Sequence, residues 1–121
     1  MGSLFTITQG KGFHIEFSNG FAVSVQFGPG NYCDNRNMGF NEPMLQLQNT
    51  GRWASNDAEV AVFYNHEFVR NIAYGDDVVG RVKSDDVAAL IGMLAAIPAG
   101  HIDCELILTN IQKILGTHEE V

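Results

Sequence analysis

The strongest constraint on the fold of this chain is an alternation of apolar and polar residues over residues 13–27. The apolar positions are Phe13, Ile15 and Phe17, and then Phe21, Val23, Val25 and Phe27. Between these two runs lies Ser18-Asn19-Gly20, a group of residues that favour turns. A period of two is typical of a strand with one buried face, so the segment predicts a β-hairpin with a strongly apolar face.

The length of the hairpin loop decides which residues share that face. Asn19-Gly20 alone would suggest a two-residue turn, but that register pairs Phe17 with Ala22 and mixes the two faces. A three-residue loop keeps the apolar side chains together. The opposite pairs are then Phe17 with Phe21, Ile15 with Val23, and Phe13 with Val25. Because burial of one face sets register, we predict the three-residue loop, with Gly20 in the left-handed conformation.

Further strands and turns are predicted on both sides of this hairpin. The predicted strands span residues 4–8, at an edge of the sheet, and residues 44–48, 59–64, 67–73 and 78–83. The predicted turns lie at residues 10–12, 65–66 and 74–77.

Two helices are predicted to follow the last strand. Ser84 is a candidate N-cap, Asp85 and Asp86 favour the first turn, and Pro98 ends the helix. One stripe of this helix is apolar: Val87, Leu90, Ile91, Leu94 and Ile97.

The second helix is predicted to begin after Asp103 as N-cap and to run through Leu115, with Gly116 at its end. Its apolar positions are Leu106, Ile107, Leu108, Ile111, Ile114 and Leu115, which is more than one stripe requires. The spare width indicates packing between protomers, and the alternative is a helix wholly buried on its own sheet.

The whole pattern predicts one α+β domain over residues 1–121. We expect an antiparallel meander sheet with one or two C-terminal helices packed on one face. Helix 103–115 is the candidate oligomerisation element of a homo-oligomer, most simply a dimer.

Charge and composition exclude some classes of partner. The net charge is −7, and the seven Lys and Arg residues are scattered along the sequence, which argues against binding to a nucleic-acid backbone. The N-terminus has no secretory signal, and no apolar run approaches the roughly 20 residues that span a bilayer. We therefore expect a cytoplasmic protein with no membrane partner, in which Cys33 and Cys104 are free thiols.

The run GFHIEFSNGFAVSVQFGPGNYC at residues 12–33 resembles a family of small tailed-phage proteins. The resemblance continues through NDAEVAVF at residues 56–63 and GDDVVGRVKSDDVAALI at residues 75–91, and does not include residues 101–121. It implies a phage origin and action inside a bacterial host cell. It implies no particular activity and no catalytic residues.

The motifs that resemble enzyme sites are incomplete. Cys33 has no cysteine-enzyme signature around it, and nothing in the sequence brings it to His14 or His66. The histidines form no paired metal-ligand motif, and the Gly75-Asp76-Asp77 run is most simply a turn. The Gly28-Pro29-Gly30-Asn31 run lacks the lysine and the following helix of a phosphate loop. We predict a protein that is not an enzyme and needs no metal or cofactor.

Two irregular segments, residues 28–43 and 49–57, carry the residues that favour ligand binding. The candidate site residues are Asn31, Tyr32, Asp34, Asn35, Arg36, Arg52, Trp53 and Asn56. Tyr32 and Trp53 offer flat stacking surfaces, and Arg36 and Arg52 can hold phosphate. The asparagines offer donors and acceptors for base or ribose edges. Each also has a structural explanation, for example Trp53 as a core residue and Arg36 as a partner of Asp34.

These groups together are those of a nucleotide pocket. The function expected from sequence is therefore a non-enzymatic phage protein that counters host defence by sequestering a small nucleotide signal. The alternative is a protein–protein inhibitor of a bacterial defence enzyme, acting through the acidic surface.

Overall fold

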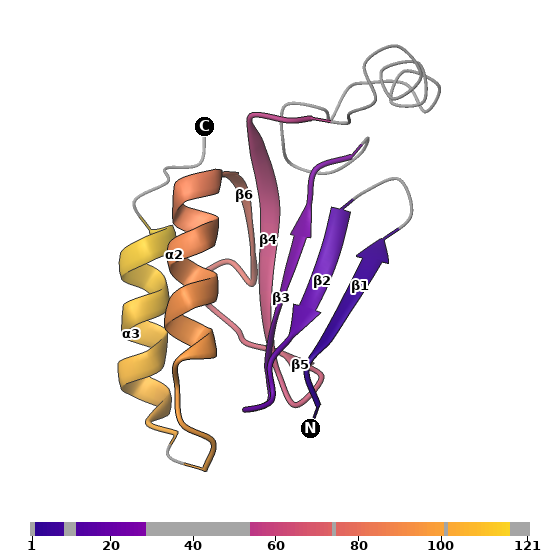
Figure 1. Cartoon of the computed structure of the whole chain (residues 1–121). Coiled ribbons are helices and arrows are strands. Elements are labelled where there is room, and N and C mark those ends of the chain that lie inside the picture. Colours follow the sequence, from indigo (N-terminus) through magenta and orange to yellow (C-terminus); the bar gives the residue numbers. More distant parts are fainter. Residues whose placement is uncertain (1, 9–11, 29–53, 74, 101, 117–121) are drawn as a thin grey trace.

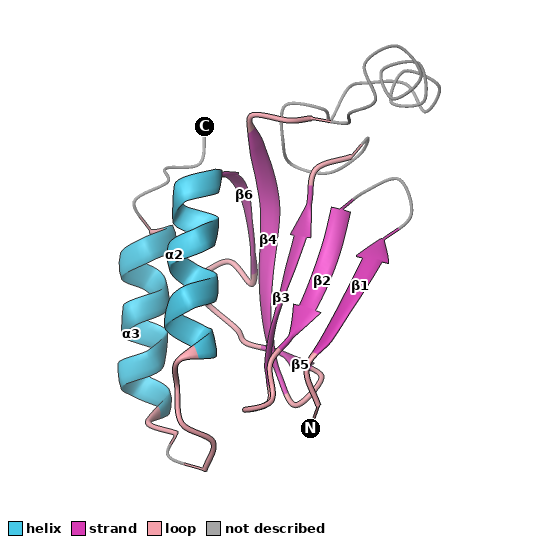
Figure 2. Ribbon diagram, viewed as in Figure 1, coloured by secondary structure: helices cyan, strands magenta, loops and turns pink. Residues whose placement is uncertain are grey.

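The fold is α+β, with one antiparallel sheet of six strands and two C-terminal helices on one of its faces (Figures 1 and 2). The computed structural model describes residues 2–8, 12–28, 54–73, 75–100 and 102–116. The strands are β1 (Leu4–Thr8), β2 (Gly12–Glu16), β3 (Phe21–Gln26), β4 (Asp57–Tyr64), β5 (Glu67–Phe68) and β6 (Val78–Lys83). The helices are α2 (Ser84–Ala95) and α3 (Cys104–Leu115).

Consecutive strands are neighbours in the sheet, in the order β1-β2-β3-β4-β5, and β6 also pairs with β4. Since β3 occupies one edge of β4, the short β5 and the longer β6 share its other edge. Figure 1 shows that the helices stand beside β6, β4 and β3, and that β1 is the strand farthest from them. The predicted meander and its edge strand at residues 4–8 are confirmed.

The predicted hairpin register is also confirmed. Phe13 lies opposite Val25 and Ile15 lies opposite Val23. The loop closes through two backbone hydrogen bonds, from the Phe17 N–H to the Phe21 carbonyl oxygen (2.8 Å) and from the Gly20 N–H to the Phe17 carbonyl oxygen (3.1 Å). Gly20 has a φ of 99°, which a side chain would oppose.

The core forms where the apolar face of β3 and β4 meets the helices. Val23, Val60 and Val62 are completely buried, as are Leu90 and Leu94 of α2. From α3, a single stripe reaches this core: Ile107, Ile111 and Leu115. Leu108 and Ile114 are partly buried against the core, while Leu106 is 56% exposed. The apolar residues of α3 beyond this stripe are thus only partly buried within one chain.

The hairpin loop also holds the end of α2. The Asn19 side-chain amide donates to the carbonyl oxygens of Leu94 and Ile97, both at 2.8 Å. Its side-chain oxygen accepts from the Phe21 N–H at 3.0 Å. A helix leaves its last carbonyl groups without partners in the helix, so Asn19 satisfies groups that would otherwise need water. One side chain therefore joins the turn predicted from sequence to a helix more than 70 residues later in the chain.

The predicted helix boundaries agree with the structure for α3 but differ at both ends of α2. The predicted stripe runs to Ile97, with Pro98 ending the helix, whereas α2 ends at Ala95. Ser84 is the first helical residue rather than the N-cap, and Lys83 occupies the cap position without a side-chain cap. The N-cap of α3 is Asp103 as predicted, and its carboxylate accepts from the Leu106 N–H at 3.1 Å.

The prediction of a strand over residues 67–73 is wrong beyond Phe68. Asn65 and His66 form the predicted turn, both with positive φ. Asn71 then takes a φ of 61°, and its N–H donates to the Asp77 carboxylate at 2.7 Å while its side-chain oxygen accepts from Gly75. These local bonds compete with strand pairing and turn the chain toward β6.

Strand β6 contains a bulge that explains its apolar pattern. Ala58 of β4 lies opposite Val82, whereas Val60 lies opposite Val79, so β6 carries one additional residue there. Arg81, within the bulge, has a φ of 59°. The bulge allows Val79 and Val82, three residues apart, to be buried together.

Two predictions concern residues that are wholly or partly outside the described ranges. The strand predicted at residues 44–48 lies outside them. The turn predicted at residues 10–12 lies partly outside, and Gly12 itself belongs to β2. A Cβ atom on Gly12 would overlap the Val25 carbonyl oxygen, so only glycine fits this position.

Candidate ligand-binding cleft

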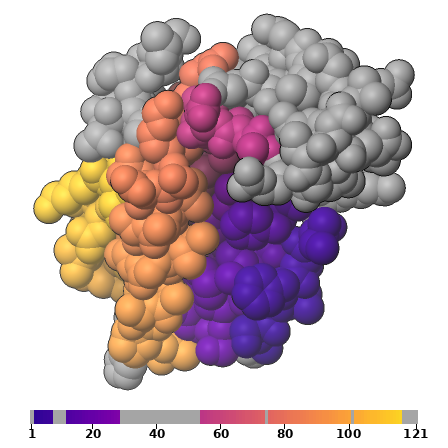
Figure 3. Space-filling view, turned by 45° about the horizontal axis from the view of Figure 1, so that its top comes forward, coloured from indigo at the N-terminus to yellow at the C-terminus, as the bar shows by residue number. Residues whose placement is uncertain are grey.

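A cleft of about 300 Å³ opens where β2, β3 and β4 meet the start of α2. Its lining residues are Phe13, Val25, Phe27, Ala54, Ser55, Asn56, Asp57, Ala58, Val82, Ser84 and Val87. We call this site the β4–α2 cleft. In Figure 3 the residues that begin β4 lie between α2 and the first strands of the sheet, at the end of the molecule where the cleft is found.

The walls of the cleft follow directly from the sheet register. Phe13 and Val25 are opposite neighbours on β2 and β3, and Val25 is in turn opposite Val60 of β4. Val87 extends from the first turns of α2 toward the same face. Phe27 follows β3 directly, so the cleft is the end of the apolar core that the helices leave open.

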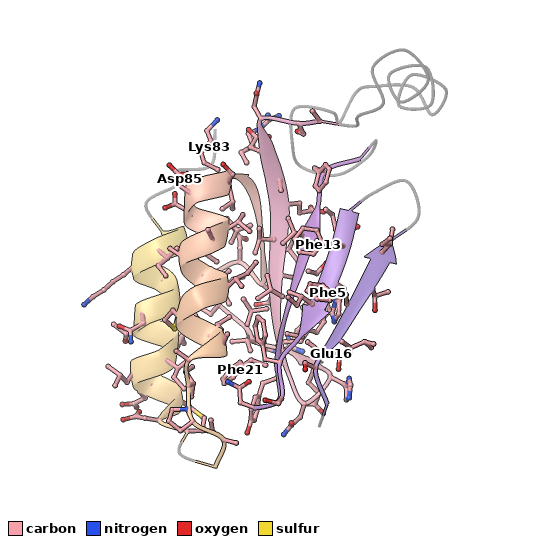
Figure 4. All side chains as sticks on the ribbon, viewed as in Figure 1. Phe5, Phe13, Glu16, Phe21, Lys83 and Asp85 are labelled. Atoms are coloured by element: carbon pink, nitrogen blue, oxygen red, sulfur yellow. The ribbon has the colours of Figure 1, made fainter. Side chains whose placement is uncertain are left out.

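The polar groups of the cleft come from the entry to β4 and the start of α2. Asp57 is buried, and its carboxylate lies 3.7 Å from the ammonium group of Lys83, which precedes α2. The Ser55 hydroxyl donates to the Asp57 carbonyl oxygen at 2.8 Å. Figure 4 shows Lys83 and Asp85 close together at the start of α2. Asn56 is exposed and Ser84 is the first residue of the helix, so an amide and a hydroxyl group lie at the rim.

Of the predicted site residues, only Asn56 lies among those the structure describes, and it lines this cleft. The other seven lie outside the described residues: Asn31, Tyr32, Asp34, Asn35, Arg36, Arg52 and Trp53. Strand β3 ends at Gln26 and strand β4 begins at Asp57, and the described residues between them stop at Gly28 and resume at Ala54. Phe27 and Ala54, next to these two points, both line the cleft.

Sequence reasoning missed the residues that make up most of the cleft. The alternation placed Phe13 and Val25 on the apolar face, and the helical spacing placed Val87 on the buried stripe. No pattern indicated that the core is open at this end. The signal that could have found the cleft is its position, next to both of the segments that are predicted from sequence to be irregular, residues 28–43 and 49–57.

The opposite face of the sheet brings together side chains that are distant in sequence. His14, Glu16 and His66 line a hollow of about 150 Å³ with Phe63. The His14 ring nitrogen Nε2 lies 3.9 Å from the Glu16 carboxylate. Within the described ranges, no group of three or more His, Cys, Asp or Glu side chains is arranged to hold a metal ion.

A third hollow, of about 230 Å³, lies at the other end of the molecule between α3 and the β4–β5 hairpin. It is mainly apolar and includes Phe21, Tyr64 and Ile107. Cys104 lies at its edge as an exposed free thiol, and Cys33 falls outside the described residues.

Comparison of the chain with protein-family models, with curated proteins and with solved structures found no match. In the part of the chain that the structure describes, no helix is long and apolar enough to cross a membrane.

Proposed function

We propose that this protein is a non-enzymatic binding protein that sequesters a small nucleotide signal, with the base and ribose in the β4–α2 cleft. The observation that carries the proposal is the composition of the cleft. Aromatic and aliphatic walls meet the Asn56 amide and the Ser84 hydroxyl group, and Phe27 and Ala54 of the cleft adjoin the segment that contains the predicted stacking and phosphate-binding residues.

The size and chemistry of the cleft suit a nucleoside. Small-molecule pockets usually measure about 300–1,000 Å³ and are mostly apolar with a few polar groups, and this cleft of about 300 Å³ is at the small end of that range. Phe13 and Phe27 offer ring surfaces, and stacking on an aromatic side chain contributes about 1–3 kcal/mol per base. The Asn56 amide and the Ser84 hydroxyl can pair with donors and acceptors on a base or ribose.

The charges near the cleft favour one orientation of the ligand. Asp57 lines the cleft, and Asp85 and Asp86 occupy the first turn of α2. The Lys83 ammonium group, 3.7 Å from the Asp57 carboxylate, offsets part of this negative charge. Like charges repel most strongly where water is excluded, so the phosphates would point away from the cleft. Arg36 and Arg52 remain the predicted phosphate ligands.

The biological setting of the proposal comes from the resemblance to tailed-phage proteins. A phage protein acting in the cytoplasm of its bacterial host can counter host defence by removing a nucleotide signal from solution. Such a protein must bind stoichiometrically and release the ligand unchanged when it unfolds.

The test is a thermal-shift and calorimetric screen against cyclic oligonucleotides and ADP-ribose derivatives. A ligand bound only by the folded protein raises its melting temperature. Phe27→Ala and Asn56→Ala should each weaken binding of the best ligand, the former by about tenfold or more. The matched control is Phe68→Ala, an exposed phenylalanine on β5 that does not line the cleft.

Three results would contradict the proposal. If no nucleotide raises the melting temperature, a protein–protein inhibitor becomes the better interpretation. If the ligand is recovered chemically changed, the protein is an enzyme. If Phe68→Ala weakens binding as much as Phe27→Ala does, the ligand lies elsewhere.

A further inference from the structure

The two most exposed of the large apolar side chains in the described residues lie on β1, at the edge of the sheet. Phe5 is 79% exposed and Ile7 is 85% exposed. The register places Phe5 opposite Ile15 and Ile7 opposite Phe13, so these two side chains lie on the same face of the sheet as the core. Figure 4 shows Phe5 and Phe13 on the part of the sheet that extends beyond the helices. We call Phe5, Ile7, Phe13 and Ile15 the β1–β2 strip.

The outer edge of β1 is open as well as apolar. It is the outermost strand of the sheet, and in the described ranges it pairs only with β2. Its sequence, LFTIT, has no charged residue and no proline. Exposed edges in monomeric proteins are usually protected by lysine, proline, a bulge or a covering segment, because open backbone groups recruit another strand. An edge without these features is suited to pairing.

The strand is complementary to itself. We propose that two copies of this chain associate by antiparallel pairing of their β1 strands about a two-fold axis at Thr6. In this register Phe5 of each copy lies opposite Ile7 of the other, and Leu4 lies opposite Thr8. The register pairs all five residues of β1 and keeps Phe5 and Ile7 of both copies on one face, whereas a shift by one residue would mix the faces.

Charge favours a second copy at this strand over other surfaces. The chain carries a net charge of −7, so two copies repel each other, and a contact that contains no acidic residue adds the least to this repulsion. Strand β1 satisfies that condition along its whole length. The exposed apolar residue of α3, Leu106, directly follows Glu105 and is a single side chain. The structure therefore favours β1 over α3 as the oligomer contact.

The buried area indicates a weak, reversible dimer. An aromatic side chain buries on the order of 150–250 Å², so Phe5 of the two copies would account for about 300–500 Å². With Ile7 of both copies and the paired backbones, the contact would bury at most about 1,000 Å², the lower limit for a specific interface. A dissociation constant in the micromolar range or weaker is expected. Because Ile7 lies opposite Phe13, and Phe13 lines the cleft, the joined strips would connect the interface to both clefts.

The first experiment measures mass by sedimentation velocity over a range of protein concentrations. Wild-type protein should shift from monomer to dimer as the concentration rises. Ile7→Lys should remove the dimer, because it places a charge in the apolar cluster of the interface. Leu106→Lys is the matched control, an exposed aliphatic residue on α3, and should dimerise like the wild type. Equal melting temperatures and circular dichroism of the dilute proteins would show that both variants fold.

The second experiment tests the register by cross-linking. Opposite residues of an antiparallel pair have Cα atoms about 4.5–5.5 Å apart, within the range that a disulfide spans. In a background with Cys33→Ser and Cys104→Ser, Thr6→Cys should form a covalent dimer under mild oxidation. Thr109→Cys, on the exposed surface of α3, should not. A wild-type protein that stays monomeric up to about 1 mM would overturn the proposal, as would cross-linking through residue 109 but not residue 6.

Discussion

The two halves of the sheet share one sequence pattern but differ in what covers them. One row of opposite residues crosses the sheet through Phe5, Ile15, Val23 and Val62. Phe5 is 79% exposed at one end of this row, and Val23 and Val62 are completely buried at the other. Ile15, between them, is partly buried. The alternation decides which face a residue occupies, and the position of the helices decides whether that face is buried.

The same comparison explains where the candidate sites lie. The β4–α2 cleft and the β1–β2 strip are both parts of the apolar face that α2 and α3 leave uncovered. The cleft is concave and has polar groups at its rim, which suits a small ligand. The strip is open and uncharged, which suits a second strand.

The largest predicted effect comes from placing a charge in the buried half of the row. Val23→Asp should destabilise the protein by about 4 kcal/mol or more, because the carboxylate would be buried without a partner. That is a large part of the 5–15 kcal/mol typical of a domain, so the variant is expected to be mainly unfolded. Circular dichroism and urea denaturation measure the effect.

Phe5→Asp is the matched substitution at the open end. It should change the free energy of unfolding of the monomer by no more than about 0.5 kcal/mol. Similar destabilisation by both substitutions would mean that the strip is covered in the monomer, and the distinction between the two halves would be lost.

A smaller effect is expected from removing a buried apolar side chain from the helices. Leu94→Ala removes a completely buried side chain of α2 and should cost about 2–5 kcal/mol. Leu106→Ala, on the exposed side of α3, should cost about 0.5 kcal/mol or less. Urea denaturation at a fixed protein concentration compares the two. A large cost at Leu106 would show that α3 is buried by an interaction beyond the single chain.

The smallest of the three effects concerns the link between hairpin and helix. Asn19→Ala removes the donor to the Leu94 and Ile97 carbonyl groups and should cost about 1–3 kcal/mol. Ser18→Ala, at the neighbouring exposed position of the same loop, should be nearly neutral. Thermal unfolding of both variants provides the measurement. If the two variants have the same melting temperature, the Asn19 hydrogen bonds do not stabilise α2.

Much of the fold could be predicted because local patterns agree with the global arrangement. The hairpin register followed from the requirement that Phe13, Ile15 and Phe17 share a face with their partners. The start of α3 followed from the capping chemistry of Asp103. The strand predicted through residue 73 was wrong because Asn71 and Asp77 hydrogen-bond the backbone locally, which no alternation pattern reveals.

The candidate site was less predictable than the fold. Asn56 was chosen from sequence and lines the cleft, but Phe13, Phe27 and Val87 were assigned only to the core. A lining residue and a core residue have the same pattern in sequence, since both are apolar and on the inner face. They differ only in whether another element packs against them.

The sequence by itself determined the faces, the periods and the ends of most elements of this protein, because these depend on side-chain spacing and on neighbours along the chain. Only the tertiary structure decided how far the helices extend over the sheet. That extent depends on contacts between distant residues, such as the bonds from Asn19 to the end of α2 and the packing of Leu90 and Leu94 on the sheet. Two helices of twelve residues each cover β3, β4 and β6, and they leave β1 exposed.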